Sequence, residues 1–207
     1  MTNQYRKPIG WLGSWTLRKM NKHHSQLTDW GFSHLSIPRG GAILDIGCGG
    51  GRTVAKLAIV SGTGLVYGLD HSEESVRVAS KTNSDLIRTG RVEILQGSVS
   101  QLPYEDNSFD LVTAVETHFF WPDLPSDVRE VWRVVKPGGS FAIIAEAYKD
   151  AKSKIARKYA PKLGMTMLTP DEHRELLLNA GFAEAQISTD TQKFWICAVG
   201  RKTRRKS

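Results

Sequence analysis

Residues 43–54 read ILDIGCGGGRTV, and this stretch decides how the rest of the chain is interpreted. Directly after an apolar run that carries Asp45, four glycines fall within five positions: Gly47, Gly49, Gly50 and Gly51. Glycine at this density is costly unless the backbone must turn sharply or let a ligand come close. The stretch therefore predicts a buried strand that ends in a tight ligand-binding turn.

Two kinds of phosphate-binding loop fit this turn poorly. A nucleoside-triphosphate loop requires Lys followed by Ser or Thr after its last glycine, and neither follows here. A dinucleotide loop, GxGxxG, requires a third glycine for close helix packing, but Arg52 or Val54 stands at that position. Asp45 at the end of the strand would also repel a pyrophosphate. The turn is therefore predicted to hold a ligand that is cationic and lacks a phosphate.

Short β-rich runs alternate with helical patterns from residue 40 onward. Because the runs are nearly continuous in apolar residues, they predict strands buried on both faces, joined by right-handed crossovers. Only the stretch TDTQ, residues 189–192, separates AQIS from KFWICAVG in the last two runs, which must therefore form an antiparallel hairpin. The predicted fold class is α/β: a Rossmann-like, seven-stranded, mostly parallel sheet with a C-terminal antiparallel hairpin and helices on both faces. The runs cover residues 42–47, 64–70, 91–97, 109–116, 139–147, 185–189 and 193–200.

The helices between these runs carry end signals. Ser72 before two glutamates predicts a capped helix start, and TPDE at residues 169–172 predicts a capping box with proline at the first helical position. Apolar residues with a helical period end at KPGG, residues 136–139, which is expected to stop that helix.

Composition favours a soluble, cytoplasmic protein with one compact domain. The 207 residues are 40% hydrophobic, which is enough for one core, and no apolar run approaches the ~18 residues of a membrane span. The first residues also lack the continuous apolar stretch that is typical of a signal peptide. Cys48 and Cys197 are far apart, so neither a disulfide framework nor a metal site is expected. Five of the 28 Lys and Arg lie in the last seven residues, so much of the net charge of +7 belongs to a tail. Such a tail is usually a solvated end, with nucleic-acid or membrane contact as the alternative.

Four motifs in order identify a family resemblance over roughly residues 40–145. They are ILDIGCGGG at 43–51, VYGLDHS at 66–72, GSVSQLPYEDNSFDLV at 97–112 and EVWRVVKPGGSF at 130–141. Together they resemble the class I S-adenosylmethionine-dependent methyltransferases, especially the small-molecule branch that includes the ubiquinone/menaquinone C-methyltransferases. The resemblance implies S-adenosyl-L-methionine as cofactor, S-adenosyl-L-homocysteine as product, and methyl transfer to a small organic acceptor by in-line displacement.

The resemblance also implies a set of cofactor-binding residues. Asp70 ends the second strand and is expected to accept both ribose hydroxyls, with its neighbours beside the ribose and adenine. Asp45 either organises the loop or faces the ammonium group. Ser98 stands where the family often has Asp, so the Val99 backbone is expected to carry part of the adenine contact. The full set is Asp45, Gly47, Gly49, Gly50, Asp70, His71, Ser72, Ser98, Val99 and Glu116.

The acceptor is expected at the carboxyl ends of the strands, where open α/β sheets bind ligands. His118 is the leading candidate for a general base or a substrate-orienting residue, with Glu116 and His24 as further catalytic candidates. The alternative is a histidine packed among aromatic residues or capping the next helix. Aromatic residues either wall the acceptor pocket or belong to the core. The predicted pocket residues are Met20, Trp30, Phe119, Phe120, Trp121 and Tyr148.

A single methyltransferase domain over 1–207 is expected to have five parts. An N-terminal helical cover (1–36) precedes the cofactor-binding core (37–147), and an inserted lid (148–168), a C-terminal helix and hairpin (169–200) and a basic tail (201–207) follow. The lid holds six Lys and Arg against one acid. This excess favours an anionic acceptor if the lid borders the mouth of the site, and solvated helix faces are the alternative.

Two other function classes compete with the small-molecule enzyme. The basic tail and lid suit an RNA or protein methyltransferase, but the chain has no RNA-binding module, no NPPY-like tetrapeptide after the fourth strand and no catalytic cysteine pair, so nucleic acid is an unlikely partner. A non-catalytic S-adenosylmethionine-binding protein is disfavoured by the intact glycine turn and Asp70.

Overall fold

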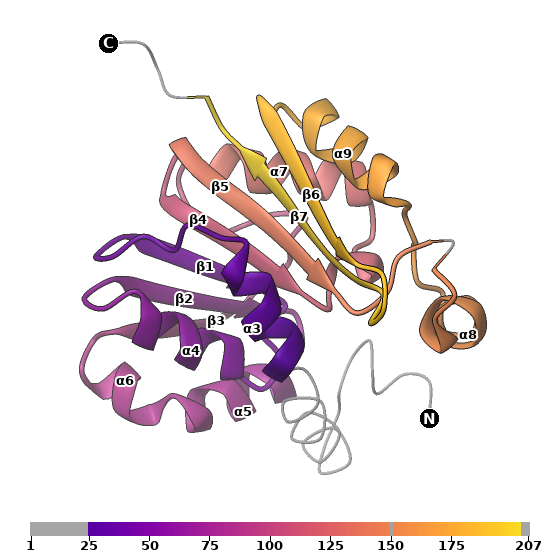
Figure 1. Cartoon of the computed structure of the whole chain (residues 1–207). Coiled ribbons are helices and arrows are strands. Elements are labelled where there is room, and N and C mark those ends of the chain that lie inside the picture. Colours follow the sequence, from indigo (N-terminus) through magenta and orange to yellow (C-terminus); the bar gives the residue numbers. More distant parts are fainter. Residues whose placement is uncertain (1–24, 150, 204–207) are drawn as a thin grey trace.

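Seven strands form one sheet in the order β3-β2-β1-β4-β5-β7-β6 in the computed structural model, which describes residues 25–149 and 151–203 (Figure 1). The first five strands are parallel, and β7 pairs antiparallel with both β5 and β6, which confirms the predicted fold class and its hairpin. The strands are β1 Ala42–Ile46, β2 Leu65–Asp70, β3 Val92–Gln96, β4 Phe109–Val115, β5 Val135–Ala145, β6 Glu184–Asp190 and β7 Trp195–Arg201.

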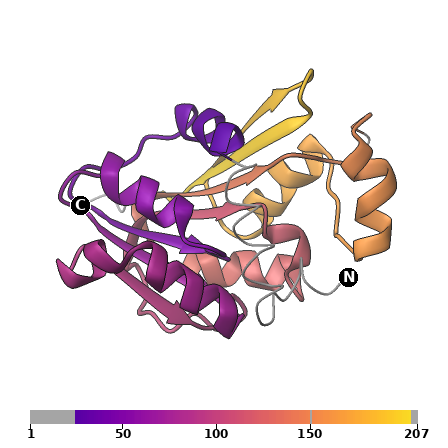
Figure 2. The ribbon, with the colours of Figure 1, turned by 90° about the horizontal axis from the view of Figure 1, so that it is seen from below.

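Helices cover both faces of the sheet (Figure 2). One apolar cluster joins α3, α4 and α5 to the sheet, and a second joins α7 and α9 to its other face. Neighbouring β1 residues alternate between them, since Ile43 belongs to the first cluster and Leu44 to the second. The helices are α3 Ser25–Ser33, α4 Arg52–Val60, α5 Glu73–Thr82, α6 Ser84–Arg88, α7 Leu124–Val134, α8 Ala160–Leu163 and α9 Pro170–Asn179, with a 3-10 turn η1 at His118–Phe120 and a π-helical turn η2 at Ile155–Tyr159.

The predicted helix starts are confirmed. The Ser72 side chain accepts a hydrogen bond from the Ser75 N–H at the start of α5. At the start of α9, the Thr169 side chain accepts from the Glu172 N–H at 3.0 Å, and the Glu172 carboxylate accepts from the Thr169 N–H at 2.7 Å. Both ends are fixed by residues within three positions, which is why a local pattern was sufficient to predict them.

Helix α7 ends at Val134, before the KPGG stretch, as predicted. Strand β5 begins earlier than the predicted run 139–147, because residues 136–139 already lie inside it. Val135 pairs with Phe109, and the next pair is Leu111 with Ser140, so the extra residues form an irregular bulge. A bulge absorbs a proline and two glycines that a regular ladder would not accept, and both Phe109 and Val135 are buried.

The segment between β5 and α9 is tied down at both ends. The Lys149 N–H donates to the Leu168 carbonyl, and the Thr166 N–H donates to the Phe119 carbonyl. In Figure 1 the arrowheads of β4 and β5 point toward the side of the molecule where α8 lies.

None of the helices within residues 25–149 and 151–203 has the length and apolarity that crossing a membrane requires.

Lys202 belongs to the folded sheet and not to the predicted basic tail. Strand β7 runs to Arg201, and the Lys202 backbone exchanges hydrogen bonds with Gly138 and Gly139. Its ammonium group donates to the carbonyls of Trp132 and Val135 at 2.8 Å and lies 3.9 Å from the Trp132 ring centre. A cation therefore caps the carbonyl end of α7, where the helix dipole favours positive charge.

Replacing Lys202 with methionine should lower the free energy of unfolding by about 2–3 kcal/mol. The substitution keeps the apolar stem but removes a charged donor, and hydrogen bonds to charged groups contribute roughly 1.5–3 kcal/mol. Urea denaturation measures the change. Arg201→Met, which removes the same charge from an exposed side chain next to it, should change stability by less than about 0.5 kcal/mol. Equal losses in the two variants would contradict the capping role.

Candidate active site

The glycine turn folds back onto the end of β2. The N–H groups of Gly47 and Cys48 both donate to the Leu69 carbonyl, at 2.7 and 3.1 Å. Gly47 has a φ of 71°, and a Cβ built on it would lie 2.1 Å from the Thr117 hydroxyl oxygen. Gly51 has a φ of 78°, and its Cβ would lie 2.8 Å from the Ala79 Cα. Both the positive φ and the close packing therefore require glycine at these two positions.

Asp70 holds this turn from the neighbouring strand. One carboxylate oxygen accepts from the Gly49 N–H and the other from the Ser72 N–H, each at 2.9 Å. The residue is 6% exposed. Each carboxylate oxygen can still accept a further hydrogen bond, because an ionised carboxylate offers about four acceptor positions. The arrangement therefore fixes the turn and the start of α5 and still leaves acceptor capacity for a ligand. The half-exposed His71 ring lies 3.6 Å from the same carboxylate.

Asp45 is buried beside this group. Its carboxylate accepts from the Thr113 hydroxyl at 2.7 Å. Burial raises the pKa of Asp45 to about 7; the Thr113 hydrogen bond opposes that shift, and the Asp70 charge adds to it. A cation lying next to this carboxyl group would lower its pKa, because it favours the ionised form.

The end of β4 is strained. Glu116 has a φ of 59°, a left-handed conformation that costs free energy in a residue other than glycine and is enriched at functional sites. Two hydrogen bonds hold it there: its N–H donates to the Ile144 carbonyl at 2.9 Å, and its carboxylate accepts from the Glu146 N–H. The ends of β4 and β5 are thereby locked together.

Directly after this strained residue, His118 meets a histidine from α9. The Nε2 atoms of His118 and His173 lie 3.2 Å apart, and Nδ1 of His173 lies 2.8 Å from the Thr169 carbonyl oxygen. His118 is 2% exposed and His173 is 1% exposed. Burial lowers the pKa of both imidazoles, that of His118 strongly. Nδ1 of His118 has no hydrogen-bond partner in residues 25–149 and 151–203.

The structure brings some of the predicted pocket residues together and separates others. Phe119, Phe120 and Tyr148 lie in one apolar cluster with Met165. Trp121 instead stacks on Phe141, with ring centres 6.1 Å apart, within the core under α7 and α9.

Other predicted residues lie elsewhere. Trp30 packs edge-on against His34, with ring centres 4.7 Å apart, and against Trp195 of β7 at 5.7 Å. Exposed Ser98 accepts from the Ser100 N–H, and Val99 is buried in the core. Met20 and His24 lie outside the described residues.

Three residues at the site were not among the predicted ones. Thr113 binds Asp45, His173 meets His118, and the buried Asn83 donates to the Gly51 carbonyl at 2.9 Å. Their partners lie 32 to 68 positions away, so no local motif contains them. No group of three or more His, Cys, Asp or Glu in the described part of the chain could hold a metal ion.

Comparisons with known sequences match this chain to methyltransferases. The sequence profile of a family described as "Methyltransferase domain" matches residues 44–143. The demethylmenaquinone methyltransferase of Oceanobacillus iheyensis is 30% identical over 181 residues, which cover 76% of each chain. The chain spans less of the longer sterol 24-C-methyltransferases it also matches: 42% of the Saccharomyces cerevisiae protein.

Two solved structures share the fold. A chain from the complex between the Haloferax volcanii Trm112 methyltransferase activator and a methyltransferase superposes with a TM-score of 0.83 at 22% identity, covering 94% of this chain and 96% of that one. The geranyl diphosphate C-methyltransferase of Streptomyces coelicolor, solved with S-adenosyl-L-homocysteine, gives 0.75 at 14% identity, covering 87% and 79%.

One assignment follows from three findings: the motifs, the strand order, and the similarity to a methyltransferase over three quarters of both sequences. The chain belongs to the class I S-adenosylmethionine-dependent methyltransferase family.

Proposed function

We propose that this enzyme transfers the methyl group of S-adenosyl-L-methionine to a small organic acceptor by in-line displacement. The observation that carries the proposal is the buried Asp70 carboxylate, which binds both the Gly49 N–H of the glycine turn and the Ser72 N–H at the start of α5. The bound donor supplies an activated methyl group. The protein has mainly to align and desolvate the acceptor, so no catalytic triad is needed.

The cofactor is proposed to lie along the glycine turn. Gly47 and Gly49 have positive φ, so the backbone can approach the amino-acid part and the ribose. Asp70 is assigned to the ribose hydroxyls, and the half-exposed His71 is assigned to the edge of the nucleoside. The assignments of Gly50, Ser72, Ser98, Val99 and Glu116 stay predictions, as do those of His24 and Met20.

Asp70→Ala should weaken S-adenosyl-L-homocysteine binding by about 1–3 kcal/mol, because it removes the ribose acceptor and releases the Gly49 N–H. Calorimetry measures the affinity. Asp70→Asn should lose less, since its amide oxygen can still accept one of these hydrogen bonds. The matched control is Glu73→Ala, which removes an exposed carboxylate three positions along the chain. Unchanged affinity in Asp70→Ala would contradict the ribose assignment.

Asp45 is proposed to face the ammonium group of the cofactor, directly or through water. With a pKa of about 7 in the free protein, it is about half protonated at neutral pH. A cation placed beside it would lower that pKa and expel the proton. Cofactor binding would then be coupled to proton release.

S-adenosyl-L-homocysteine should therefore bind more tightly as pH rises from about 5 to 7 and then level off. Near pH 6.5, the heat of binding should depend on the ionisation enthalpy of the buffer, which counts the protons released. Asp45→Asn should remove this dependence.

The same pKa gives a stability test of Asp45 in the free protein. The folded state holds the Asp45 proton between pH 3.8 and about 7, so the stability of the free protein falls as pH rises through that range. Asp45→Asn should thus stabilise the free protein at pH 8, by roughly 1–4 kcal/mol, and have little effect at pH 3.5. Two results together would contradict the role of Asp45: an affinity for S-adenosyl-L-homocysteine that does not change with pH, and a stability difference between Asp45→Asn and the wild type that is the same at pH 3.5 and pH 8. The first would argue against a cation beside Asp45, and the second would argue against the effect of burial on its pKa.

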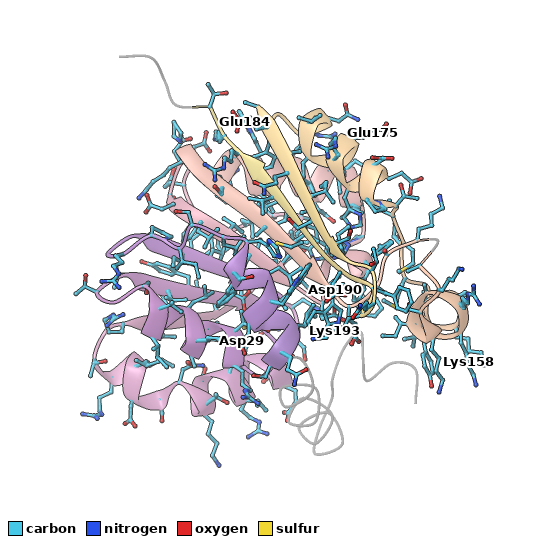
Figure 3. The ribbon with its side chains drawn as sticks, viewed as in Figure 1. Asp29, Lys158, Glu175, Glu184, Asp190 and Lys193 are labelled. Atoms are coloured by element: carbon cyan, nitrogen blue, oxygen red, sulfur yellow. The ribbon has the colours of Figure 1, made fainter. Side chains whose placement is uncertain are left out.

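An anionic acceptor is proposed on the charge of the segment between β5 and α9. Within residues 151–168 the basic side chains are exposed, and Figure 3 shows Lys158 on the outer side of that segment. The Lys149 ammonium group binds the Glu172 carboxylate at 2.9 Å, so its charge is partly balanced. The exposed basic residues are Lys152, Lys154, Arg157, Lys158 and Lys162.

Reversing two of these charges should slow methylation of an anionic acceptor. In Lys154→Glu/Lys158→Glu, we expect the KM for a carboxylate acceptor to rise about 3–10-fold at low salt, and the KM for its neutral amide to stay constant. Lys81→Glu/Arg88→Glu makes the same change in charge on α5 and α6 and should alter neither value. An equal effect on both acceptors would argue against electrostatic selection.

A further inference from the structure

The protons of the His118–His173 pair can be placed by elimination. The Thr169 carbonyl can only accept, so Nδ1 of His173 carries a proton and donates it across the 2.8 Å contact. Because burial keeps the His173 imidazole neutral, its Nε2 carries a lone pair. That lone pair faces Nε2 of His118 at 3.2 Å, and two facing lone pairs would repel each other. Nε2 of His118 must therefore carry the proton.

The consequence is a lone pair on Nδ1 of His118. This nitrogen is buried and has no partner in the described part of the chain. A buried acceptor left without a hydrogen bond is costly, so its retention calls for an explanation. The Thr169 carbonyl also accepts a hydrogen bond from the His173 backbone N–H at 3.0 Å. This bond belongs to the first turn of α9 and fixes the Thr169 end of the hydrogen bonds that run from Thr169 through His173 to His118.

The position of His118 links it to the proposed reaction. The residue before it, Thr117, packs on Gly47 of the glycine turn. The residue after it, Phe119, lies in the apolar cluster with Phe120 and Tyr148. His118 thus stands between the proposed cofactor turn and the proposed acceptor pocket.

We propose that His173 is a positioning residue that fixes the His118 tautomer, so that Nδ1 of His118 takes a proton from the methyl acceptor. This inference rests on the proposed function and names the acceptor class: a molecule that loses a proton on methylation, through a hydroxyl or an acidic C–H group. A thioether or a tertiary amine has no such proton and is excluded.

The proposed step balances in atoms and charge. The acceptor atom forms a bond to the methyl carbon while the carbon–sulfur bond breaks, and that electron pair stays on sulfur. The acceptor O–H or C–H bond breaks, and its proton moves to Nδ1 of His118. One positive charge disappears from sulfur as one appears on imidazole, so the buried region gains no net charge, which would be costly.

The second imidazole stabilises the charge on the first. Once protonated, His118 donates a charge-assisted hydrogen bond from Nε2 to His173, which is stronger than the neutral one. Of the titratable groups around the pair, the Glu172 carboxylate favours the positive charge, and the Lys149 ammonium that binds it opposes the charge. The first turn of α9 also opposes it, because a helix dipole is positive there.

Nitrogen-15 NMR of the full chain labelled in histidine tests the tautomer without any acceptor. At pH 7, with S-adenosyl-L-homocysteine present, His118 should show a protonated Nε2 and an unprotonated Nδ1. His173→Leu should convert His118 to a mixture of tautomers and lower the kcat for a hydroxyl acceptor at least tenfold, with the affinity for S-adenosyl-L-homocysteine changed less than twofold. His173→Gln should restore both, because an amide can donate to the Thr169 carbonyl and accept from His118.

The controls separate this inference from the proposed function. Glu175→Leu places the same side chain at an exposed position of α9 and should leave the His118 signals and kcat unchanged (Figure 3). Failure to bind S-adenosyl-L-homocysteine would refute the proposed function, yet the tautomer could still be read. A wild-type His118 with its proton on Nδ1, or with both nitrogens protonated, would overturn the inference even if His173→Leu does not fold. So would a His173→Leu variant with the wild-type tautomer and kcat.

Discussion

The hydrogen bonds of the Asp70 carboxylate are the constraint on which the proposed cofactor end of this molecule depends. Parallel strands β1 and β2 lie side by side, and the Leu69 carbonyl of β2 accepts from the first N–H groups of the glycine-rich turn after β1. Asp70 adds a side-chain partner for the same turn at the Gly49 N–H and also binds the Ser72 N–H at the start of α5. One buried side chain therefore sets the positions of a turn and a helix.

Burying Asp70 beside a second acid, Asp45, has an electrostatic cost. Burial raises the pKa of Asp45 to about 7, chiefly by removing water from its carboxylate, and the nearby charge of Asp70 adds to the shift. The free protein can lower this cost by keeping a proton on Asp45. A cationic ligand lowers it in another way, so the same pair of acids that destabilises the empty site favours a sulfonium or ammonium ligand.

The proposed acceptor end of the site is organised by long-range contacts of a different kind. Glu116 is held in a strained conformation by β5, and His118 is held by α9. The segment that leads from β5 to α9 bonds to Phe119 on its way. Three separate parts of the sequence thus meet after β4, at the carboxyl end of the sheet where α/β folds bind ligands.

The sequence by itself determined the features that neighbouring residues decide. The glycine turn, the caps at Ser72 and Thr169, the alternation of strands and helices, and the short hairpin all depend on residues a few positions apart, and the structure has each of them. Only the tertiary structure decided which side chains meet across the fold: Thr113 with Asp45, His173 with His118, and Lys202 with the end of α7. It also placed Trp121 in the core under α7 and α9, although Phe119, two positions earlier, lies in the apolar cluster with Phe120 and Tyr148. A hydrogen bond between residues 55 or more positions apart leaves no periodic pattern in a single sequence, because its geometry is set by how the strands and helices pack.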